Sequence, residues 1–288
     1  MKIVCSLDFE LWLQPYQVYV CDILEYLSKQ GHQIYINAEK LHPAIECRLS
    51  TYPKYQSNVY VDIHLNVTSK YSIVLRNVNA EKHTYWVLTT DVYFTTINHS
   101  AFVEEFYDKI IIPFDDKKRF ENQKNLKIGI CDEIPRHEFK SFKTIGMFSQ
   151  DVHNLKQDPL RFFGKEYSVY VFGDRAVPIQ YEVKQIFSYD INFISSIVGI
   201  WFAYNNSLVD FNLIKAMLAG LCCIVKPNVY NSYLLSNLNS IQIFDPLQIK
   251  SRLESLNPDD IIQLGSQART DILTLHPSIE KYIKELVS

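Results

Sequence analysis

Short apolar runs of strand length alternate with amphipathic helical segments along this chain, and that alternation constrains the fold more than any other feature. The first example comprises a strand over Lys2–Leu7, a helix over Tyr16–Lys29 and a strand over His32–Ile36. The helix is predicted from apolar residues on one face and from Gly31 just after its end. Such β-α-β units close right-handed with parallel strands, so we expect an α/β fold.

The same alternation restarts after a charged stretch over Asp132–Lys143, which contains Pro135 and is predicted to be a linker. Two α/β halves in tandem predict two Rossmann-like, doubly wound domains that face a cleft. We expect an N-terminal domain over residues 1–138 and a C-terminal domain over 139–288, whose last helix could pack back on the first domain. A chain of 288 residues can bury a core in each.

The pattern also places the individual elements. Further strands are predicted over Val59–Leu65, Tyr71–Leu75, Thr84–Leu88, Lys109–Pro113, Asn125–Ile130, Thr144–Phe148, Ser168–Phe172, Ile197–Tyr204, Leu221–Val225 and Ser240–Phe244. Further helices are predicted over Ala101–Tyr107, Glu182–Phe187, Phe211–Ala219, Leu247–Leu253, Pro258–Leu273 and Pro277–Val287.

Charge and composition narrow the class of protein. An apolar content of 47% with a net charge of −3 excludes a disordered chain. A protein that binds nucleic acid through nonspecific charge is usually basic overall, so any DNA contact here needs a local positively charged patch. The strongest local positive patch is the trio Lys117, Lys118 and Arg119, together with Lys124 and Lys127; the alternative interpretation is an ordinary solvated loop.

The cysteines and the apolar runs indicate a compartment. Six cysteines lie in mostly apolar settings without a C-x-x-C pair, which suits reduced, buried thiols. The start of the chain does not resemble a signal peptide, and no apolar run is long enough for a membrane span. No metal-binding spacing occurs. We therefore expect a cytoplasmic, monomeric protein without a bound metal.

In open parallel sheets, ligands bind at the carboxyl ends of the strands. Asp91 follows a run predicted to be buried, where its pKa could rise enough for general base catalysis. The alternative is that Asp91 caps a turn or helix. His64, near the end of another predicted strand, is a candidate base or phosphate contact; the alternative is a structural histidine.

Two features of the second half could bind a phosphate. The turn at Gly173 lets backbone approach a ligand, and Arg175 could grip a phosphate with two hydrogen bonds. The helix after Asp210 offers free N–H groups at its start, and Asn212 and Lys215 lie on it. The alternative for Lys215 is an ordinary exposed helix lysine.

Two segments resemble signatures of the GT-B glycosyltransferases, which bind a nucleotide sugar between two Rossmann-like domains. Gln17–Ile34 is similar to the family's first helix and its GHxV strand entry, and Leu213–Val225 is similar to its LEAMAxGxPVI donor-binding segment. Gly146 and Phe172–Asp174 stand at donor-domain strand positions. The resemblance implies a transferase that uses a UDP-sugar as donor and requires no cofactor.

A closer similarity is to the DNA β-glucosyltransferase type of T-even phages. Trp86–Val92 resembles the strand that ends in that group's catalytic aspartate, and Val171–Ala176 resembles its FFGNAR turn. The resemblance implies an inverting transfer to a hydroxymethylated base in double-stranded phage DNA, with Asp91 as base. The basic trio is then the candidate for DNA phosphate contacts.

The sequence departs from this family at the donor site. Lys215 stands where an acidic residue contacts the donor ribose, and Gln150 and Asn154 stand where an arginine pair contacts the diphosphate. Lys156 and Arg175 are the nearest cations that could substitute. The predicted donor-binding residues are Gly146, Gln150, Lys156, Gly173, Arg175, Asn212 and Lys215. Two alternatives stay open: a GT-B enzyme for a bacterial surface glycan or lipid carrier, and a catalytically degenerate GT-B nucleotide-binding protein.

Overall fold

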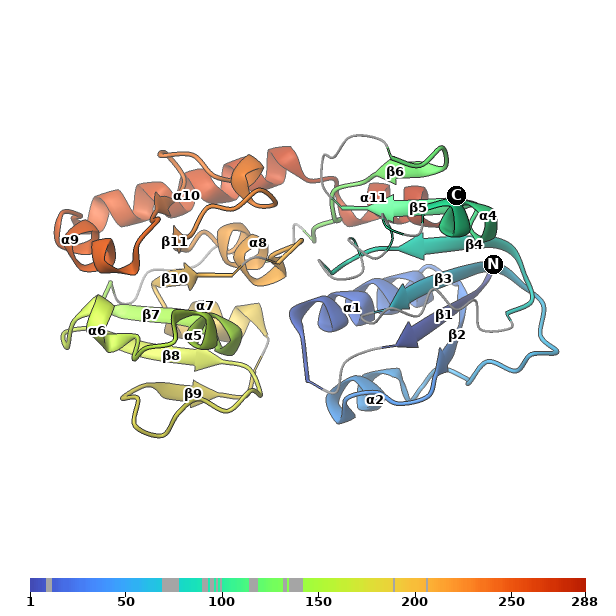
Figure 1. Ribbon diagram of the computed structural model, residues 1–288, viewed down its shortest axis with the longest axis horizontal. Coiled ribbons are helices and arrows are strands. Elements are labelled where there is room, and N and C mark those ends of the chain that lie inside the picture. The colour runs from blue at the N-terminus through green and yellow to red at the C-terminus, as the bar shows by residue number, and fades with distance from the viewer. Residues whose placement is uncertain are drawn as a thin grey trace. The chain divides into compact units, whose positions relative to one another are not determined.

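A computed structural model describes residues 1–8, 12–68, 78–89, 93, 96, 98, 100–113, 119–131, 134, 142–188, 190–205 and 207–288. The chain divides into two compact units (Figure 1). Unit 1 consists of Met1–Gly129, Ser207–Val209 and Ile279–Ser288, and unit 2 of Ile130–Asn206 and Asp210–Ser278. The two units divide near residue 130, whereas the boundary was predicted between residues 138 and 139. Most residues between these two positions lie outside the described part of the chain.

Unit 1 is built on one parallel sheet in the order β2-β1-β3-β4-β5-β6. Its strands are β1 (Lys2–Asp8), β2 (Gln33–Ala38), β3 (Val61–Thr68), β4 (Ala80–Trp86), β5 (Lys109–Ile112) and β6 (Gln123–Asn125). Its helices are α1 (Pro15–Lys29), α2 (Pro43–Leu49), α4 (Ser100–Phe106) and α11 (Ile279–Val287).

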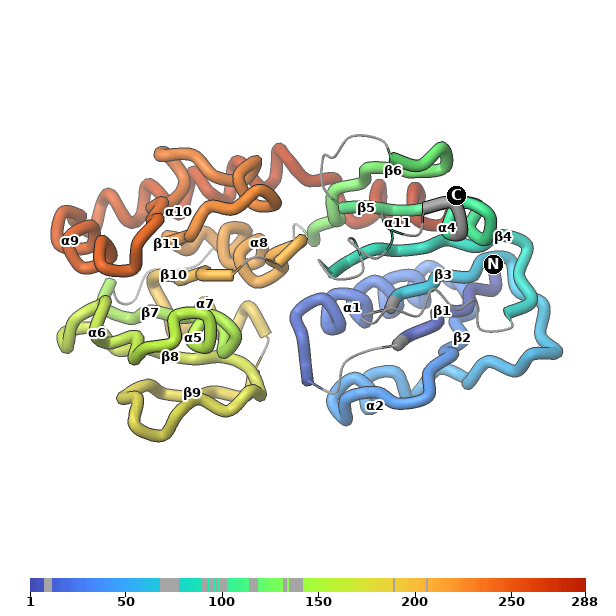
Figure 2. Tube along the Cα trace, in the orientation of Figure 1, coloured from blue at the N-terminus to red at the C-terminus, as the bar shows by residue number. Residues whose placement is uncertain are grey.

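Aromatic packing ties the last helix of the chain to unit 1. In α11, Tyr282 is fully buried, with its ring 6.4 Å from Tyr19 and 6.1 Å from Trp86 between centroids. Gly129 is required at this point, because a Cβ there would lie 2.5 Å from the Tyr282 Cβ. Lys124 of β6 pairs with Glu285 of α11 at 3.0 Å, so α11 lies beside β6 (Figure 2).

Unit 2 is built on a second parallel sheet, in the order β12-β11-β10-β7-β8-β9. Its strands are β7 (Thr144–Phe148), β8 (Ser168–Phe172), β9 (Lys184–Ile186), β10 (Ile200–Ala203), β11 (Cys222–Val225) and β12 (Ile241–Gln242). Its α-helices are α5 (Ser149–Leu155), α6 (Leu160–Phe163), α7 (Ile191–Ile197), α8 (Phe211–Leu218), α9 (Ile249–Glu254) and α10 (Pro258–Leu275), with short 3-10 turns η1 (Ser232–Leu234) and η2 (Pro246–Gln248).

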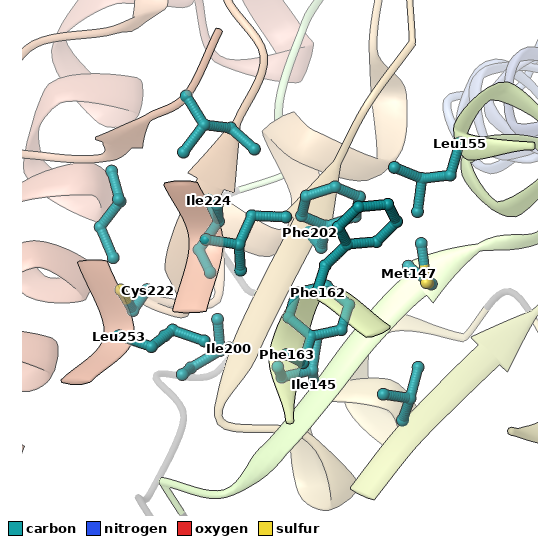
Figure 3. Packing of buried hydrophobic residues seen from close by; sticks show 14 of the residues in the cluster. Ile145, Met147, Leu155, Phe162, Phe163, Ile200, Phe202, Cys222, Ile224 and Leu253 are labelled. Carbon is teal, nitrogen blue, oxygen red and sulfur yellow. The ribbon is translucent and has the colours of Figure 1, made fainter. Parts of the chain in front are cut away.

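The core of unit 2 forms where strands β7, β8, β10 and β11 meet the covering helices (Figure 3). Phe163 and Phe202 are fully buried and meet edge to face, with centroids 5.2 Å apart. Such an aromatic pair contributes about 0.5–1.5 kcal/mol beyond the area it buries. Phe202 also stacks on Tyr204, so the packing continues from the core to the end of β10.

The helices of unit 2 begin and end where local chemistry predicts. The Asp210 carboxylate accepts a hydrogen bond from the Leu213 N–H and caps α8. The α10 helix starts with a reciprocal capping box between Asn257 and Asp260. After α8, Gly220 adopts a φ of +79°, which glycine accommodates without strain.

Four predicted elements need correction or lie outside the described residues. Glu182–Phe187 is not a helix: Lys184–Ile186 forms β9, because parallel pairing with β8 overrides local propensity. Asn125–Ile130 is not a continuous strand, since β6 ends at Asn125. Ile197 ends a helix rather than starting a strand. The strand predicted over Tyr71–Leu75 lies outside the described residues.

Candidate functional site

The strand order of unit 2 contains one reversal of direction, between β7 and β10. Chain order runs outward from β7 to β8 and β9 on one side, and outward from β10 to β11 and β12 on the other. This is the strand order of dinucleotide-binding sheets, which bind ligands outside the carboxyl ends of the strands at this reversal. The segments that follow β7 and β10 are therefore the candidates for ligand contact in unit 2.

Two buried carboxyl groups meet at this reversal. Asp151 lies in α5, directly after β7, and is 1% exposed; Asp210 follows β10 and is 8% exposed. The Asn205 side-chain amide donates to both, at 3.3 Å to Asp151 and 2.8 Å to Asp210. Asp151 also accepts hydrogen bonds from the backbone N–H groups of Phe148 and Tyr204, at 3.3 and 2.8 Å.

Burial governs the protonation of this carboxyl pair. Loss of solvent, and next the nearby Asp210, raise the pKa of Asp151 to about 8. Burial likewise raises the pKa of Asp210 above its usual value. Two carboxylates so close in a buried setting cannot both ionise easily, so the pair holds a proton at neutral pH.

A row of hydrogen bonds crosses the same edge from β8 to β10. Arg175, in the turn after β8, donates to the Gln150 side chain in α5. Gln150 donates to Asn154 at 3.2 Å, and Asn154 donates to the Tyr204 carbonyl at 3.0 Å. The structure thus joins Gln150 and Arg175, two predicted donor-binding residues. It also includes Asn154, four residues after Gln150 in α5.

A second cation lies at the end of the next strand. Lys226 directly follows β11, and its Nζ lies 4.5 Å from the centroid of the Tyr204 ring. Its backbone N–H donates to the Ala203 carbonyl at 3.0 Å, which continues the pairing of β11 with β10. Lys226 was absent from the predicted site, because the sequence there shows only an isolated lysine before a proline.

The other predicted donor-binding residues lie apart from this row or have a packing role. Gly146 is mid-strand in β7, where a Cβ would lie 3.0 Å from the Trp201 ring and the Val198 side chain, so close packing accounts for it. Gly173 follows β8 with a φ of +117°. Lys156 ends α5 with a φ of +56°. Asn212 and Lys215 lie in α8.

The residues predicted for unit 1 are only partly described. Asp91, Lys117 and Lys118 lie outside the described residues. Arg119 is exposed, and its backbone N–H donates to Gln123 at 2.9 Å.

His64 was predicted to lie near the end of a strand, but it lies in the middle of β3, which continues to Thr68. The His64 side chain is fully buried inside the sheet. Its Nε2 lies 2.8 Å from the Ser6 Oγ, and its Nδ1 lies 3.0 Å from the His83 Nδ1. Burial, followed by the nearby His83, lowers the pKa of His64 to about 3. These contacts keep the ring neutral and within the sheet.

Sequence reasoning missed most of the polar contacts at the edge of unit 2. Asp151, Asn205 and Tyr204 were not among the predicted site residues, and Asp210 was considered only as the residue before a predicted helix. The available signal was the sequence order of the strands. Residues after the first and fourth strands of such a half converge at the reversal of direction.

Within the described part of the chain, no group of three or more His, Cys, Asp and Glu side chains could hold a metal ion. No described helix is long and apolar enough to cross a membrane.

No protein-family model matches the sequence, and no curated protein matches it either. Solved structures do resemble it. HepE from Anabaena in complex with UDP and glucose has a TM-score of 0.71 at 11% identity, with 98% of this chain and 97% of that chain covered. Sucrose-phosphate synthase from Thermosynechococcus elongatus has a TM-score of 0.71 at 9% identity, with 99% and 97% covered.

A third similar structure is an alpha-glucosyltransferase in complex with UDP and a 13-mer DNA containing a HMU base. Its TM-score is 0.66 at 11% identity, with 99% of this chain and 98% of that chain covered. At such identities the likeness establishes the fold alone. The predicted fold class is confirmed: this chain has the α/β architecture of the GT-B glycosyltransferases, with two Rossmann-like sheets.

Proposed function

We propose that this protein is a glycosyltransferase that moves a sugar from a UDP-sugar to a hydroxyl group. The observation that carries the proposal is the polar row Arg175–Gln150–Asn154–Tyr204 at the strand reversal of unit 2. It occupies the edge where such sheets bind nucleotides, in a fold shared with proteins solved in complex with UDP.

The donor would be held at the carboxyl edge of unit 2. Gly173 leaves room for the backbone to approach a phosphate, and the Arg175 guanidinium supplies a positive charge beside it. Lys156, Asn212 and Lys215 are further predicted contacts. Positive charge at this edge would stabilise the departing UDP as negative charge develops on its phosphate oxygen.

For the chemical step, we propose an inverting transfer with Asp91 as the base. The acceptor oxygen forms a bond to the anomeric carbon while the bond from that carbon to the phosphate oxygen breaks. Asp91 takes the proton of the acceptor hydroxyl, and UDP leaves. The buried His64 has no part in this step, because its ring contacts lie inside the sheet.

The proposed acceptor is a hydroxymethylated base in phage DNA, with the base flipped out of the stack. The similar alpha-glucosyltransferase was solved with DNA that contains a HMU base, which supports this class of acceptor. Lys117, Lys118 and Arg119 would contact DNA phosphates. We further propose that the protein acts in the cytoplasm and as a monomer.

The test is a transfer assay with a panel of UDP-sugars. DNA containing 5-hydroxymethylcytosine, unmodified DNA and oligosaccharide acceptors are compared by UDP release and by acceptor mass. We expect UDP release that depends on the hydroxymethylated DNA, with one sugar added per modified base. Transfer to oligosaccharides alone would replace DNA by a surface glycan as acceptor. UDP binding without any transfer would identify a degenerate nucleotide-binding protein.

A further inference from the structure

Lys226 presents a positive charge at the nucleotide-binding edge of unit 2. We propose that Lys226 binds the diphosphate of the donor, together with Arg175, and replaces the arginine pair that the sequence lacks at Gln150 and Asn154. This inference rests on the proposed function, because it takes a nucleoside diphosphate as the ligand.

Backbone contacts fix the position of Lys226. Its N–H donates to the Ala203 carbonyl at 3.0 Å, and its carbonyl accepts from the Asn231 side chain at 3.2 Å. In the same loop, the Asn228 side chain donates to the Asn205 carbonyl at 3.0 Å. The loop after β11 is therefore tied to the segment after β10, and Lys226 starts from a defined backbone position.

The Tyr204 ring holds the Lys226 side chain. The Tyr204 N–H donates to Asp151 at 2.8 Å, and its carbonyl accepts from Asn154 at 3.0 Å. Its ring stacks on Phe202, with centroids 5.9 Å apart and an interplanar angle of 7°. A cation over an aromatic ring is attracted to the ring face but keeps its hydrogen-bond donors. Among the described residues, no carboxylate pairs with Lys226, so its charge is not neutralised.

The side chains of Lys226 and Arg175 both extend toward the strand reversal. The strands lie in the order β11-β10-β7-β8, with Lys226 after the first and Arg175 after the last. The Lys226 ammonium reaches the residue after β10, and the Arg175 guanidinium reaches the helix after β7. Each residue follows an outer strand of these four, β11 or β8, and its charged group contacts a segment that follows an inner strand, β10 or β7. A diphosphate, with its charge spread over two adjacent groups, matches two cations that approach from opposite sides.

The buried carboxyl groups of Asp151 and Asp210 do not neutralise the positive charges of Lys226 and Arg175. Asp151 and Asp210 are buried, and burial raises the pKa of both, so the pair does not carry two full negative charges at neutral pH. Their hydrogen bonds are also committed to backbone N–H groups and to Asn205. They hold the loops in place and leave a net positive edge for an anionic ligand.

The experiment measures the affinity of the full chain for UDP and for uridine. Lys226→Met should weaken UDP binding by ~10- to 100-fold, the worth of a charge-assisted hydrogen bond, and leave uridine binding unchanged. Unchanged uridine binding also shows that the variant is folded. Lys226→Arg keeps the positive charge and should recover most of the lost affinity.

Unit 2 offers a matched control. Lys184 lies over the Tyr170 ring at 5.1 Å, so it forms the same kind of pair. Tyr170 is in the middle of β8 and Lys184 at the start of β9, away from the carboxyl ends. Lys184→Met should therefore leave UDP affinity within about twofold, as expected for an exposed charge far from the ligand.

The outcomes separate this inference from the proposed function. If the wild type binds UDP and Lys226→Met binds it equally well, or loses uridine to the same extent, the inference is wrong and the proposed function stands. If the wild type binds ADP or GDP but not UDP, and Lys226→Met loses that binding, the inference stands and the UDP-sugar donor is wrong. If no nucleoside diphosphate binds, both fail.

Discussion

The two sheets bury their polar side chains in different places. In unit 1, Ser6, His64 and His83 lie in the middle of neighbouring strands, and Asn37 donates to Ser6 from the next strand at 2.9 Å. In unit 2, the polar side chains lie after the strands end, around the buried Asp151. Each network is largely satisfied internally, but only the second one stands at the edge of its sheet.

This difference separates two uses of a buried polar group. A side chain in mid-strand faces its neighbours across the sheet, so its hydrogen bonds contribute to stability and strand register. A side chain beyond the strand end fixes the loops that a ligand meets. The buried polar side chains in the strands of unit 1 are therefore a structural feature. The cluster around Asp151 in unit 2 supports the candidate site.

The largest expected effect tests whether unit 1 contributes chemistry through Asp91 rather than through its buried polar side chains. Asp91→Asn should lower the transfer rate by ~10²- to 10⁴-fold, because it removes a general base, and leave UDP affinity within about twofold. Single-turnover transfer and UDP titration measure the two effects. Asp62→Asn is the matched control, since Asp62 lies near the amino end of β3 and its carboxylate accepts from the Lys2 N–H. Full activity of Asp91→Asn would remove Asp91 from the mechanism.

The next effect concerns the stability of unit 2. Asp151→Ala removes the carboxylate that accepts from the Phe148 and Tyr204 N–H groups and one of the two acceptors of the Asn205 amide, at a cost of about 2–4 kcal/mol. Urea unfolding measures the loss, and hydrogen exchange should show it first around β10. Asp259→Ala, an exposed residue in the same unit, should change stability by less than about 0.5 kcal/mol. Equal effects of the two variants would contradict the supporting role of Asp151.

A smaller effect is expected in unit 1. Ser6→Ala removes the partner of both the His64 Nε2 and the Asn37 amide, at a cost of about 1–3 kcal/mol. Hydrogen exchange in peptides from β1 and β3 should accelerate, while peptides from β7 and β10 keep the wild-type rate. Ser50→Ala, which removes an exposed hydroxyl bonded to the Cys47 carbonyl, serves as control. If hydrogen exchange accelerates equally in both units, the hydrogen bonds of Ser6 with His64 and Asn37 are not a local structural feature.

The last expected effect, and the smallest for a change of one pH unit, is a pair of opposite pH dependences. The pKa of His64 is lowered to about 3, so the unfolded chain takes up the proton first and unit 1 loses stability as the pH falls below about 6.5. The pKa of Asp151 is raised to about 8, so the folded chain holds the proton and unit 2 loses stability as the pH rises from about 4 to 8. Each slope is at most about 1.4 kcal/mol per pH unit.

Hydrogen exchange between pH 5 and 8, corrected for the intrinsic exchange rate, measures both slopes. His64→Gln should flatten the slope of unit 1 alone, and Asp151→Asn that of unit 2 alone. Slopes of the same sign in both units would contradict the assignment of neutral His64 and protonated Asp151.

Much of the architecture could be predicted from local sequence. The helix α1 was predicted from its apolar face and from Gly31 just after its end, and the helix predicted over Pro258–Leu273 agrees with α10. These signals act within one or two turns of the chain. By contrast, Lys184–Ile186 is too short for a local signal, and pairing with Tyr170–Phe172 made it a strand.

The candidate site divides in the same way. Arg175 was predicted from a turn and Gln150 from a family resemblance. Each of these signals lies within one short segment of the chain. Lys226 and Tyr204 are 22 positions apart, and Asp151 and Asp210 are 59 positions apart, so no local pattern links either pair. Their contacts depend on the order of the strands, which chain periodicity does not specify.

The sequence by itself determined the alternation of strands and helices, the caps and the two-part α/β architecture, because these arise from hydrogen bonds and side-chain contacts between near neighbours. Only the tertiary structure decided that β10 lies beside β7, and that order sets Asp151 against Asp210. It also placed Lys226 over Tyr204. The physical reason is burial: it brings distant groups together, removes their water, and so fixes which of them are charged.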